Sequence, residues 1–329
     1  MNKIKWGIVG PGIIAHEFAH DFAFARYGEL YAVASRSLER ADQFAKKYDI
    51  PKAYGSYQEL YNDPEVDAIY VATPHTFHFE NSRDALKVGK AVLCEKPLVV
   101  HPDECRKLME IATQTNNYLI EGMWTYFLPA IKKAQQWVAE DRIGKVLHVK
   151  ADFGYLIPFK PEGRMYNPDL AGGAMHDLGV YTIAAAWLFY QQDPLKMTVV
   201  SRNASTGVED DVTMLFEYEN AAASLCTSMR CKLHNYLFII GERGYIEVPD
   251  FWRARESFLY EMETPIEHYI DARKGFGFEY EIDAVSRDIA TDQLESSVVP
   301  LTTSLKLQEH IHQVLSYKAN STNQLSPVN

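Results

Sequence analysis

A lysine, an aspartate and a tyrosine are the side chains of this sequence best placed to move a proton. Lys96 lies in the segment Glu95-Lys96-Pro97, and Asp177 and Tyr181 lie four residues apart in a later segment. Residues with that spacing share one face of a helix. A tyrosine with an ordinary pKa of about 10 is a poor base at neutral pH, but a neighbouring ammonium group lowers that pKa. These three residue types could therefore form an acid–base site, although a surface carboxylate and a core tyrosine is the alternative reading of the pair.

A turn suited to phosphate groups precedes Lys96 by about eighty residues. Gly10-Pro11-Gly12-Ile13-Ile14-Ala15 follows an apolar strand and opens a helix. Gly10 permits the tight turn, Gly12 lets the backbone approach a pyrophosphate, and Ala15 lets the helix pack closely on the strand. A structural glycine turn in another α/β fold is the alternative. Combined with the acid–base residues, the turn predicts a nicotinamide-dependent oxidoreductase.

The segment after the second strand indicates which dinucleotide binds. An NAD site usually places an Asp or Glu there, to bind the ribose hydroxyls. This sequence instead has Ser35-Arg36-Ser37, with Arg40 one turn later. Hydroxyl and guanidinium groups bind a 2′-phosphate, which a carboxylate would repel. We expect NADP, with NAD still possible, because Arg36 could stack on adenine with either cofactor.

Short apolar runs alternate with helical stretches through the first 120 residues. The apolar runs are Lys5–Val9, Leu30–Ala34, Ala68–Ala72, Ala91–Cys94 and Tyr118–Glu121. The helical stretches are His16–Ala25, Leu38–Tyr48, Phe77–Val88 and Asp103–Thr113. This alternation predicts βαβ units in a doubly wound parallel sheet. Lys96 follows one of the strands, so it lies at the carboxyl edge of the sheet, where such folds bind ligands.

The pattern changes after about residue 122. Helical stretches at Ala130–Ala139 and Ala174–Tyr190 flank a strand at Val146–Phe153 and a loop rich in proline and glycine. Strand-like runs then follow one another at Met197–Asn203, Val212–Tyr218, Ala222–Ser228, Tyr236–Ile240 and Tyr245–Val248. Helices return at Phe278–Ala290 and Leu305–Lys318, before a polar tail from Ala319. The sequence therefore predicts an α/β fold with a Rossmann domain over residues 1–122. An α+β domain with an open, mostly antiparallel sheet follows over residues 123–329, for substrate binding and dimerisation.

Composition restricts the class of protein further. The chain has 329 residues, of which 47% are hydrophobic and 23% charged, and its formal net charge is −11. That charge disfavours binding to nucleic acid or to an anionic membrane. The first strand begins near Ile4, which leaves no room for a targeting segment, and the four cysteines show no ligand spacing. We expect a cytoplasmic protein with reduced, buried thiols and no metal site, and we interpret Glu209-Asp210-Asp211 as a solvated turn.

Several segments together resemble the glucose–fructose oxidoreductase, inositol dehydrogenase and rhizopine-catabolism (Gfo/Idh/MocA) family. They are Gly10-Pro11-Gly12, Ala72-Thr73-Pro74 with His78, Gly89 to Pro97, Glu121-Gly122-Met123-Trp124-Thr125, Gly172 to Tyr181, and Gly275-Phe276 before Tyr280-Glu281. The resemblance covers nearly the whole chain. Within the family the sequence looks closest to the dihydrodiol and NADP-linked D-xylose dehydrogenase group. It departs from many relatives at His75, Tyr126 and His176, and these positions bear on the substrate.

The resemblance implies roles for individual residues. Lys96, Asp177 and Tyr181 are the implied catalytic set. The implied cofactor-binding residues are Gly10, Gly12, Ile13, Ile14, Ser35, Arg36, Ser37, Arg40, Thr73, Pro74, His75, His78, Glu95 and Lys96. Trp124, Phe153, Arg164, His176 and Trp252 are the implied substrate-binding residues.

The expected activity is hydride transfer between NADP and a carbinol or carbonyl of a sugar, polyol or vicinal diol. Tyr181 is the expected acid–base group, with Lys96 as its activator and Asp177 orienting it, and proton transfer by Lys96 itself is left open. A redox-assisted glycosidase or epimerase that retains its nicotinamide, or a non-catalytic dinucleotide sensor, are alternative functions. We expect a homodimer or a dimer of dimers formed through the antiparallel sheet.

Overall fold

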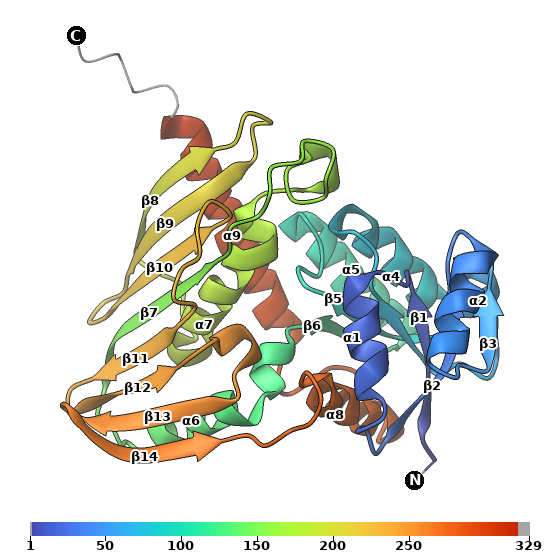
Figure 1. Cartoon of the computed structure of the whole chain (residues 1–329), viewed down its shortest axis with the longest axis horizontal. Coiled ribbons are helices and arrows are strands. Elements are labelled where there is room, and N and C mark those ends of the chain that lie inside the picture. The colour runs from blue at the N-terminus through green and yellow to red at the C-terminus, as the bar shows by residue number, and fades with distance from the viewer. Residues whose placement is uncertain (1, 322–329) are drawn as a thin grey trace. The chain divides into compact units, whose positions relative to one another are not determined.

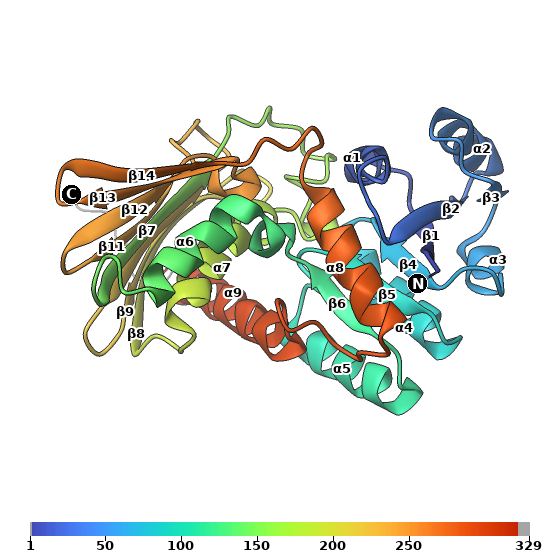
Figure 2. The same ribbon diagram turned by 90° about the horizontal axis from the view of Figure 1, so that it is seen from below.

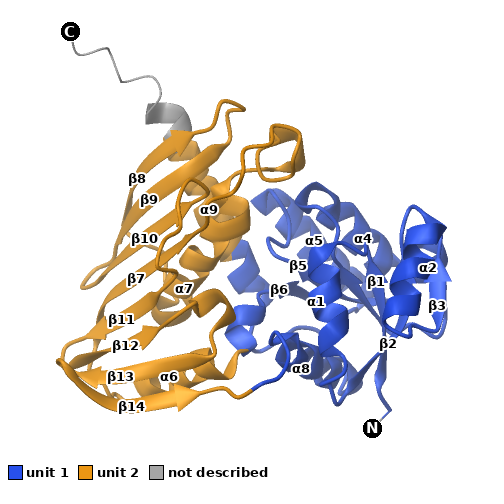
Figure 3. Ribbon diagram, in the orientation of Figure 1, with its two compact units in different colours: residues 1–127, 273–305 blue, residues 128–272, 306–329 orange. Residues whose placement is uncertain are grey.

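The computed structural model describes residues 2–321, and the chain forms two compact units (Figures 1 and 3). Unit 1 comprises Met1–Phe127 and Arg273–Leu305, and unit 2 comprises Leu128–Ala272 and Lys306–Asn329. The sequence placed a single boundary after residue 122 and did not foresee the return of residues 273–305 to unit 1. Both predicted architectures are confirmed: a doubly wound parallel sheet in one unit and a mostly antiparallel sheet in the other.

The sheet of unit 1 has six parallel strands in the order β3-β2-β1-β4-β5-β6. The strands are β1 Ile4–Val9, β2 Gly28–Ala34, β3 Lys52–Tyr54, β4 Ala68–Val71, β5 Ala91–Glu95 and β6 Leu119–Gly122. Every residue of β4, β5 and β6 is buried, as expected for parallel strands covered on both faces. The strand order reverses between β1 and β4, and such a switch point is where these sheets bind ligands.

Helices connect these strands (Figure 2). The connecting helices are α1 Ile13–Asp21, α2 Leu38–Lys47, α3 Tyr57–Tyr61, α4 His78–Lys87 and α5 Pro102–Thr115, with the short turn η1 His75–Phe77. The turn η2 Trp124–Phe127 follows β6, and α8 Phe278–Ala290, in the returning segment, packs on α1, β1 and β2. The side chain of Ser37 caps α2, and Ser56 with Glu59 forms a capping box at α3. In unit 1 the sequence pattern missed α3 and β3, because three to five residues are too few to show a periodic pattern.

The returning segment is bound to unit 1 through a buried carboxylate. Asp21, at the end of α1, is fully buried. Its two oxygens accept hydrogen bonds from the backbone N–H groups of Phe276, Gly277 and Phe278, at 3.0, 2.8 and 2.9 Å. These are unpaired donors at the start of α8, so the carboxylate satisfies them and fixes where α8 begins.

Unit 2 contains an eight-stranded sheet in the order β14-β13-β12-β11-β7-β10-β9-β8. The strands are β7 Val146–Gly154, β8 Lys196–Asn203, β9 Glu209–Glu217, β10 Ala222–Ser228, β11 Leu237–Gly241, β12 Gly244–Val248, β13 Glu256–Glu261 and β14 Thr264–Ile270. Only the β7–β10 pair is parallel. Helix α7 (Val180–Tyr190) packs on β7 and β10, and α6 (Pro129–Ala139) packs on β12, β13 and β14.

Helix α9 (Leu301–Ser321) begins in unit 1 and continues into unit 2. It extends past Ala319, the predicted start of a polar tail, and the remainder of that tail lies outside the described residues. Short turns η3 (Pro168–Leu170), η4 (Met175–Gly179) and η5 (Phe251–Arg253) complete unit 2.

Three glutamates are buried together in the core of unit 1. Glu95 at the end of β5, Glu121 on β6 and Glu281 on α8 are 6%, 0% and 0% exposed. Burial raises the pKa of Glu121 to about 7. Burial, and then the charges of Glu95 and Glu121, raise the pKa of Glu281 well above its ordinary value. Neither Glu281 oxygen has a hydrogen-bond partner among the described residues, so this carboxyl keeps its proton in the folded protein.

We expect Glu281→Gln to stabilise the protein at alkaline pH. A buried acid with a raised pKa stays protonated when folded but ionises when unfolded, so stability falls as pH rises from about 4.5 towards the folded pKa. The loss is at most about 1.4 kcal/mol per pH unit. Glutamine keeps the size and cannot ionise. The thermal midpoint of the variant should match that of the parent protein near pH 5 and exceed it at about pH 8.

Glu110→Gln on the exposed face of α5 is the matched control, and its effect on the midpoint should not change with pH. A Glu281→Gln variant that is less stable than its parent at about pH 8 would show that the ionised carboxylate is stabilised in the fold.

Candidate active site

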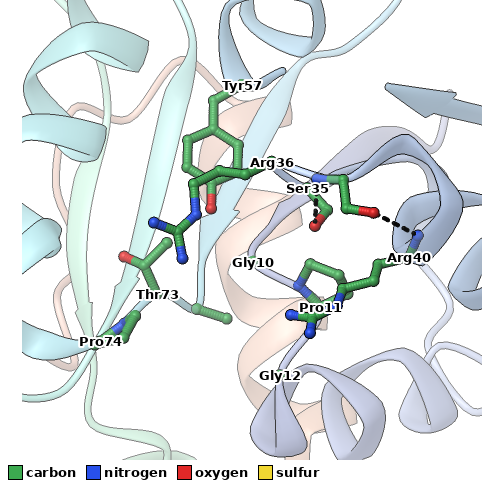
Figure 4. Close-up of a pocket in the computed structure, with 11 residues that line it drawn as sticks. Gly10, Pro11, Gly12, Ser35, Arg36, Arg40, Tyr57, Thr73 and Pro74 are labelled. Atoms are coloured by element: carbon green, nitrogen blue, oxygen red, sulfur yellow. Dashed lines mark hydrogen bonds between the residues drawn. The ribbon is translucent and has the colours of Figure 1, made fainter. Parts of the chain in front are cut away.

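A cavity of about 310 Å³ lies at the carboxyl ends of β1, β2 and β4 (Figure 4). Its lining residues are Gly10, Pro11, Gly12, Ser35, Arg36, Ser37, Arg40, Tyr57, Ala72, Thr73 and Pro74. Eight of the residues predicted to bind the cofactor are therefore brought together in one pocket. They come from three separate stretches of sequence that the sheet order places side by side.

Glycine is favoured for different reasons at the two positions of the turn. Gly10 has φ +87°, a conformation that favours glycine, and a side chain there would approach Thr73 Cγ2 and Ala72 O at 3.1 and 3.2 Å. A Cβ on Gly12 would meet only ordinary contacts, Ala72 O at 3.9 Å and Gly10 O at 4.0 Å. The protein itself therefore does not require glycine at position 12. The space that a side chain would fill, at the N-terminus of α1, fits a pyrophosphate held by backbone amides.

The ribose end of the pocket is cationic and rich in hydroxyl groups. Ser35 Oγ accepts a hydrogen bond from Ser37 N at 3.3 Å, and Ser37 Oγ accepts one from Arg40 N at 3.4 Å. A serine hydroxyl that accepts a hydrogen bond can also donate one, so both side chains are able to donate to a ligand. Figure 4 shows the Arg36 and Arg40 side chains extending in different directions from this segment. Of the described residues, none with a carboxylate lines the pocket.

Tyr57 lines the same pocket and was not predicted. It is the first residue of α3, the five-residue helix that the sequence pattern did not reveal. Burial raises the pKa of its phenol, and the nearby Arg36 lowers it. An aromatic ring and a guanidinium at one end of a nucleotide pocket can both lie against a base.

Other predicted cofactor residues lie outside the lining of this cavity. Ile13 is 86% exposed at the start of α1, and Ile14 follows it half-buried. His75 is buried in η1, and Lys96 is half-buried just after β5. Their contact with a cofactor stays a prediction.

His78 is fully buried and connects two loops at the carboxyl edge of the sheet. Its Nδ1 lies 2.8 Å from Pro97 O and its Nε2 lies 2.8 Å from Thr73 O. Because carbonyl oxygens only accept, both hydrogen bonds form when each ring nitrogen carries a proton. The ring thereby ties the Lys96–Pro97 turn to the pocket residue Thr73, and its direct contact with the cofactor also stays a prediction.

The backbone on both sides of Lys96 is held by buried glutamates. Glu95 Oε2 accepts a hydrogen bond from Lys96 N at 3.2 Å, while its other oxygen accepts one from the Tyr70 hydroxyl. Glu121 Oε1 accepts a hydrogen bond from Leu98 N at 2.8 Å. These bonds fix the turn from which the Lys96 side chain projects. Glu95 thus has a visible supporting role in addition to its predicted contact with the cofactor.

Trp124 is buried in η2 and stacks on Phe278, with the ring centroids 4.4 Å apart. Both residues belong to unit 1. Phe278 was not predicted as a site residue, since an aromatic residue at the start of a helix is usually a core residue.

The Asp177–Tyr181 segment begins with a π-helical turn. The turn η4 (Met175–Gly179) leads directly into α7, and Val180 N donates to Met175 O, five residues earlier. The prediction of one helix over 174–190 is confirmed, but without this wider turn. Such turns are common at functional sites. His176 within it is 6% exposed, and its predicted contact with substrate stays a prediction.

Arg164 and Asp177, both predicted site residues, form an ion pair. Arg164 Nη1 lies 3.1 Å from Asp177 Oδ1, and the two side chains are 42% and 18% exposed. Arg164 belongs to the long loop between β7 and η4, so the pair connects this loop to the π-helical turn.

An aromatic cluster surrounds Tyr181, which is 6% exposed. Its ring lies edge-on to Phe153 at 5.4 Å, and Phe153 stacks on Trp252 at 5.2 Å. The structure therefore brings together one predicted catalytic residue and two predicted substrate-binding residues within unit 2. The arrangement offers an apolar wall beside a phenol hydroxyl.

The acidic run at residues 209–211 was interpreted wrongly. Glu209, Asp210 and Asp211 open the strand β9 rather than a solvated turn. Glu209 and Asp210 are only 4% and 8% exposed. The sequence pattern did not reveal that this run lies in a strand, because acidic residues are depleted in strands. Within residues 2–321, no group of three His, Cys, Asp or Glu is placed to hold a metal ion, and no helix is long and apolar enough to cross a membrane.

Comparison with known proteins shows which protein family the chain resembles. Residues 4–123 match the model of the oxidoreductase family with an NAD-binding Rossmann fold, GFO_IDH_MocA, and residues 131–247 match the GFO/IDH/MocA C-terminal domain. The trans-1,2-dihydrobenzene-1,2-diol dehydrogenase of Mus musculus is 34% identical over 324 residues, which cover 94% of this chain and 95% of that protein. The Homo sapiens protein of the same name is 33% identical over 321 residues, with 94% and 96% covered.

Solved structures agree in fold. An aldose–aldose oxidoreductase from Caulobacter crescentus, complexed with glycerol, has a TM-score of 0.88 at 23% identity, covering 99% of this chain and all of that one. A 3-ketoreductase from Actinomadura kijaniata, in complex with NADP and TDP-benzene, has a TM-score of 0.84 at 24% identity, with 96% and 98% covered. With both domain models matched in order along the sequence, the chain belongs to the Gfo/Idh/MocA family and is an NAD(P)-dependent oxidoreductase.

Proposed function

We propose that this oxidoreductase uses NADP and transfers hydride to or from a CH–OH carbon of a sugar, polyol or vicinal diol. The ribose end of the pocket carries the proposal for the cofactor. Ser35, Arg36 and Ser37, with Arg40, occupy the place where an NAD site keeps a carboxylate. Two guanidinium groups and two hydroxyls there are suited to a 2′-phosphate.

In the proposed chemistry, Tyr181 is the group that gives or takes the proton. The bound nicotinamide supplies the hydride acceptor or donor. The Tyr181 hydroxyl exchanges the proton of the reacting oxygen, and the Lys96 ammonium favours the phenolate and donates a hydrogen bond to that oxygen. Asp177 orients these groups, and its ion pair with Arg164 holds the carboxylate in place.

The class of substrate is inferred from the aromatic wall and from the relatives. Phe153 and Trp252 stack on each other, and both rings lie edge-on to Tyr181, with centroids 5.4 and 6.3 Å from its ring. An aromatic wall of this kind suits the apolar side of a ring-shaped substrate, while hydroxyls on its other side remain available to polar groups. The relatives named for a cyclic vicinal diol support the same class.

We also propose that the protein works in a reducing compartment such as the cytoplasm. None of the four cysteines forms a disulfide; Cys94 and Cys105 are buried, as predicted, whereas Cys226 is half-buried and Cys231 is exposed. Free thiols of this kind persist where disulfides are kept reduced.

Arg36→Ala should weaken NADP⁺ specifically. A charge-assisted contact between arginine and a phosphate contributes about 1.5–3 kcal/mol, or about 10- to 150-fold in affinity. The KM for NADP⁺ should therefore rise at least about tenfold while that for NAD⁺ changes little. Steady-state rates with both cofactors, followed by the absorbance of the reduced nicotinamide, measure this.

Arg106→Ala removes the same charge from α5, where the guanidinium pairs with Asp103 at 2.8 Å, and should leave both KM values unchanged. Equal losses with NADP⁺ and NAD⁺ in Arg36→Ala would mean that the guanidinium stacks on the base and does not bind a 2′-phosphate.

Tyr181→Phe should abolish most turnover without loss of the cofactor. The change removes only the hydroxyl, and positioned acid–base catalysis contributes roughly 10²- to 10⁴-fold in rate. We expect kcat to fall by that factor, the basic limb of the pH profile of kcat/KM for oxidation to disappear, and the Kd for NADPH to stay unchanged. Lys96→Met should cost at least as much, and the double variant little more than the worse single one.

Tyr260→Phe removes a hydroxyl from β13 and serves as the control that should keep full activity. Normal turnover in Tyr181→Phe would assign the proton transfer to another group, with Lys96 the first candidate. Product formation without any change in free nicotinamide, across a panel of aldoses, polyols and dihydrodiols, would instead support an enzyme that retains its cofactor.

We further propose that a second copy of the chain covers the outer face of the eight-stranded sheet. The helices α6 and α7 pack on one face, and no helix among the described residues of unit 2 packs on the other (Figure 2). That outer face carries Val200 and Leu215, which are 66% and 39% exposed, and the stacked Tyr245–Tyr260 pair. A continuous sheet face with exposed apolar side chains is typical of an interface between subunits.

Light scattering at micromolar concentration should therefore give at least twice the mass of the chain, with four times that mass indicating a dimer of dimers. Leu215→Glu places a charge in this face and should shift the mass towards the monomer. Leu195→Glu is the control, since Leu195 is 75% exposed just before β8, and it should not change the mass. A monomer in the parent protein would contradict the proposal.

A further inference from the structure

A buried carboxylate lies beneath the turn that leads to Asp177 and Tyr181. Glu209, the first residue of β9, is 4% exposed. Its Oε1 accepts a hydrogen bond from Met175 N at 3.1 Å. Met175 begins the π-helical turn η4, so the carboxylate binds the first residue of the segment that carries both proposed catalytic groups.

Gly173, two residues before this turn, leaves the space that the Glu209 carboxyl group occupies. Gly173 has φ +120°, a conformation that other residues rarely adopt, and any side chain there would collide with the carboxyl group of Glu209. Gly172 is just as confined, because a Cβ there would lie 2.8–2.9 Å from the carbonyl oxygens of Asn167, Arg164 and Met165. The Gly172-Gly173 pair thus lets the loop at residues 164–167 approach the backbone at position 172 and the Glu209 carboxyl group approach it at position 173.

The Gly172-Gly173 pair also forms hydrogen bonds with the loop that carries Arg164. Gly173 N donates to Met165 O at 2.9 Å, and Gly172 N donates to Asn167 O at 3.0 Å. Arg164 is next to Met165 and pairs with Asp177. The position of the Glu209 carboxylate therefore bears on both partners of the ion pair, one through the loop and one through η4.

A buried carboxylate is costly unless its interactions replace those with water. Helix starts provide such interactions, because their N–H groups have no partner within the helix. A carboxylate that only began a strand would lie in solvent at lower cost. Its burial against Gly173 and Met175 is explained if the placement of the following turn matters.

We propose that Glu209 is a positioning residue, which sets the register of the π-helical turn and hence the placement of Asp177 and Tyr181. The inference rests on the proposed roles of those two residues. In this proposal the Glu209 side chain must be long enough to reach Met175 N. Its negative charge is less important for placing the turn.

Two conservative variants separate reach from charge. Glu209→Gln keeps the length and an acceptor oxygen, whereas Glu209→Asp keeps the charge but is one methylene too short. A displacement of about 1 Å at a catalytic group costs up to about 100-fold in rate. We expect Glu209→Asp to lower kcat by about 10- to 100-fold and Glu209→Gln to stay within about threefold of the parent protein.

Two further measurements distinguish positioning from general stability. The Kd for NADPH should be unchanged in both variants, because the cofactor pocket lies in the other unit. The basic limb of the pH profile should move in Glu209→Asp only. Glu217→Ala, at the exposed end of the same strand, where Glu217 pairs with Lys196 at 3.1 Å, is the matched control and should change neither.

Loss of activity in Glu209→Gln with normal activity in Glu209→Asp would overturn the proposal, since charge would then be the requirement. Normal kcat in both variants would overturn it as well. Tyr181→Phe, measured alongside, separates the two levels of inference. If Tyr181→Phe is inactive and Glu209→Asp is normal, only the positioning role fails; if Tyr181→Phe is normal, the proposed acid–base role fails.

Discussion

Buried carboxylates that accept backbone N–H groups fix the segments on which the candidate site depends. Asp21 binds three N–H groups at the start of α8, Glu121 binds Leu98 N beyond the Lys96 turn, and Glu209 binds Met175 N. Each interaction joins residues far apart in sequence. Each also satisfies donors that a loop or a helix start would otherwise leave unpaired in the interior, where an unpaired polar group is costly.

The charge of the molecule makes local arrangement decisive. A chain with a formal net charge of −11 repels a dinucleotide phosphate at long range. We propose that the N-terminus of α1 at Gly12 and the guanidinium groups of Arg36 and Arg40 offset this repulsion at the pocket, and none of the described residues that line it carries a carboxylate. The acids nearest the Lys96 turn are buried, and burial raises the pKa of Glu121 and Glu281, which reduces the negative charge there.

The pattern of apolar residues was enough to predict the parallel sheet and most helices, because buried strands such as β4 and β5 are uninterrupted apolar runs. The same approach missed β13, in which buried residues alternate with half-buried ones, and β14, whose residues are mostly exposed. The residues predicted to bind the cofactor lie next to glycines or in short motifs, and eight of them share one cavity. Tyr57 and Glu209 were not predicted as site residues, since the neighbours that draw attention to them come from other parts of the chain.

Unit 1 is formed by two separate stretches of the chain, and this affects how the protein folds during synthesis. Trp6, in the first strand, is fully buried and donates a hydrogen bond to Ser286 Oγ at 3.0 Å, and Asp21 binds residues 276–278. A ribosome has translated almost the entire chain before these partners leave its exit tunnel. During synthesis, the Trp6 indole and the Asp21 carboxylate therefore lack these hydrogen-bond partners until unit 2 has been synthesised. Fragments that end near residue 127 lack α8 altogether, so the two units are inseparable as products of a gene although they are distinct as folds.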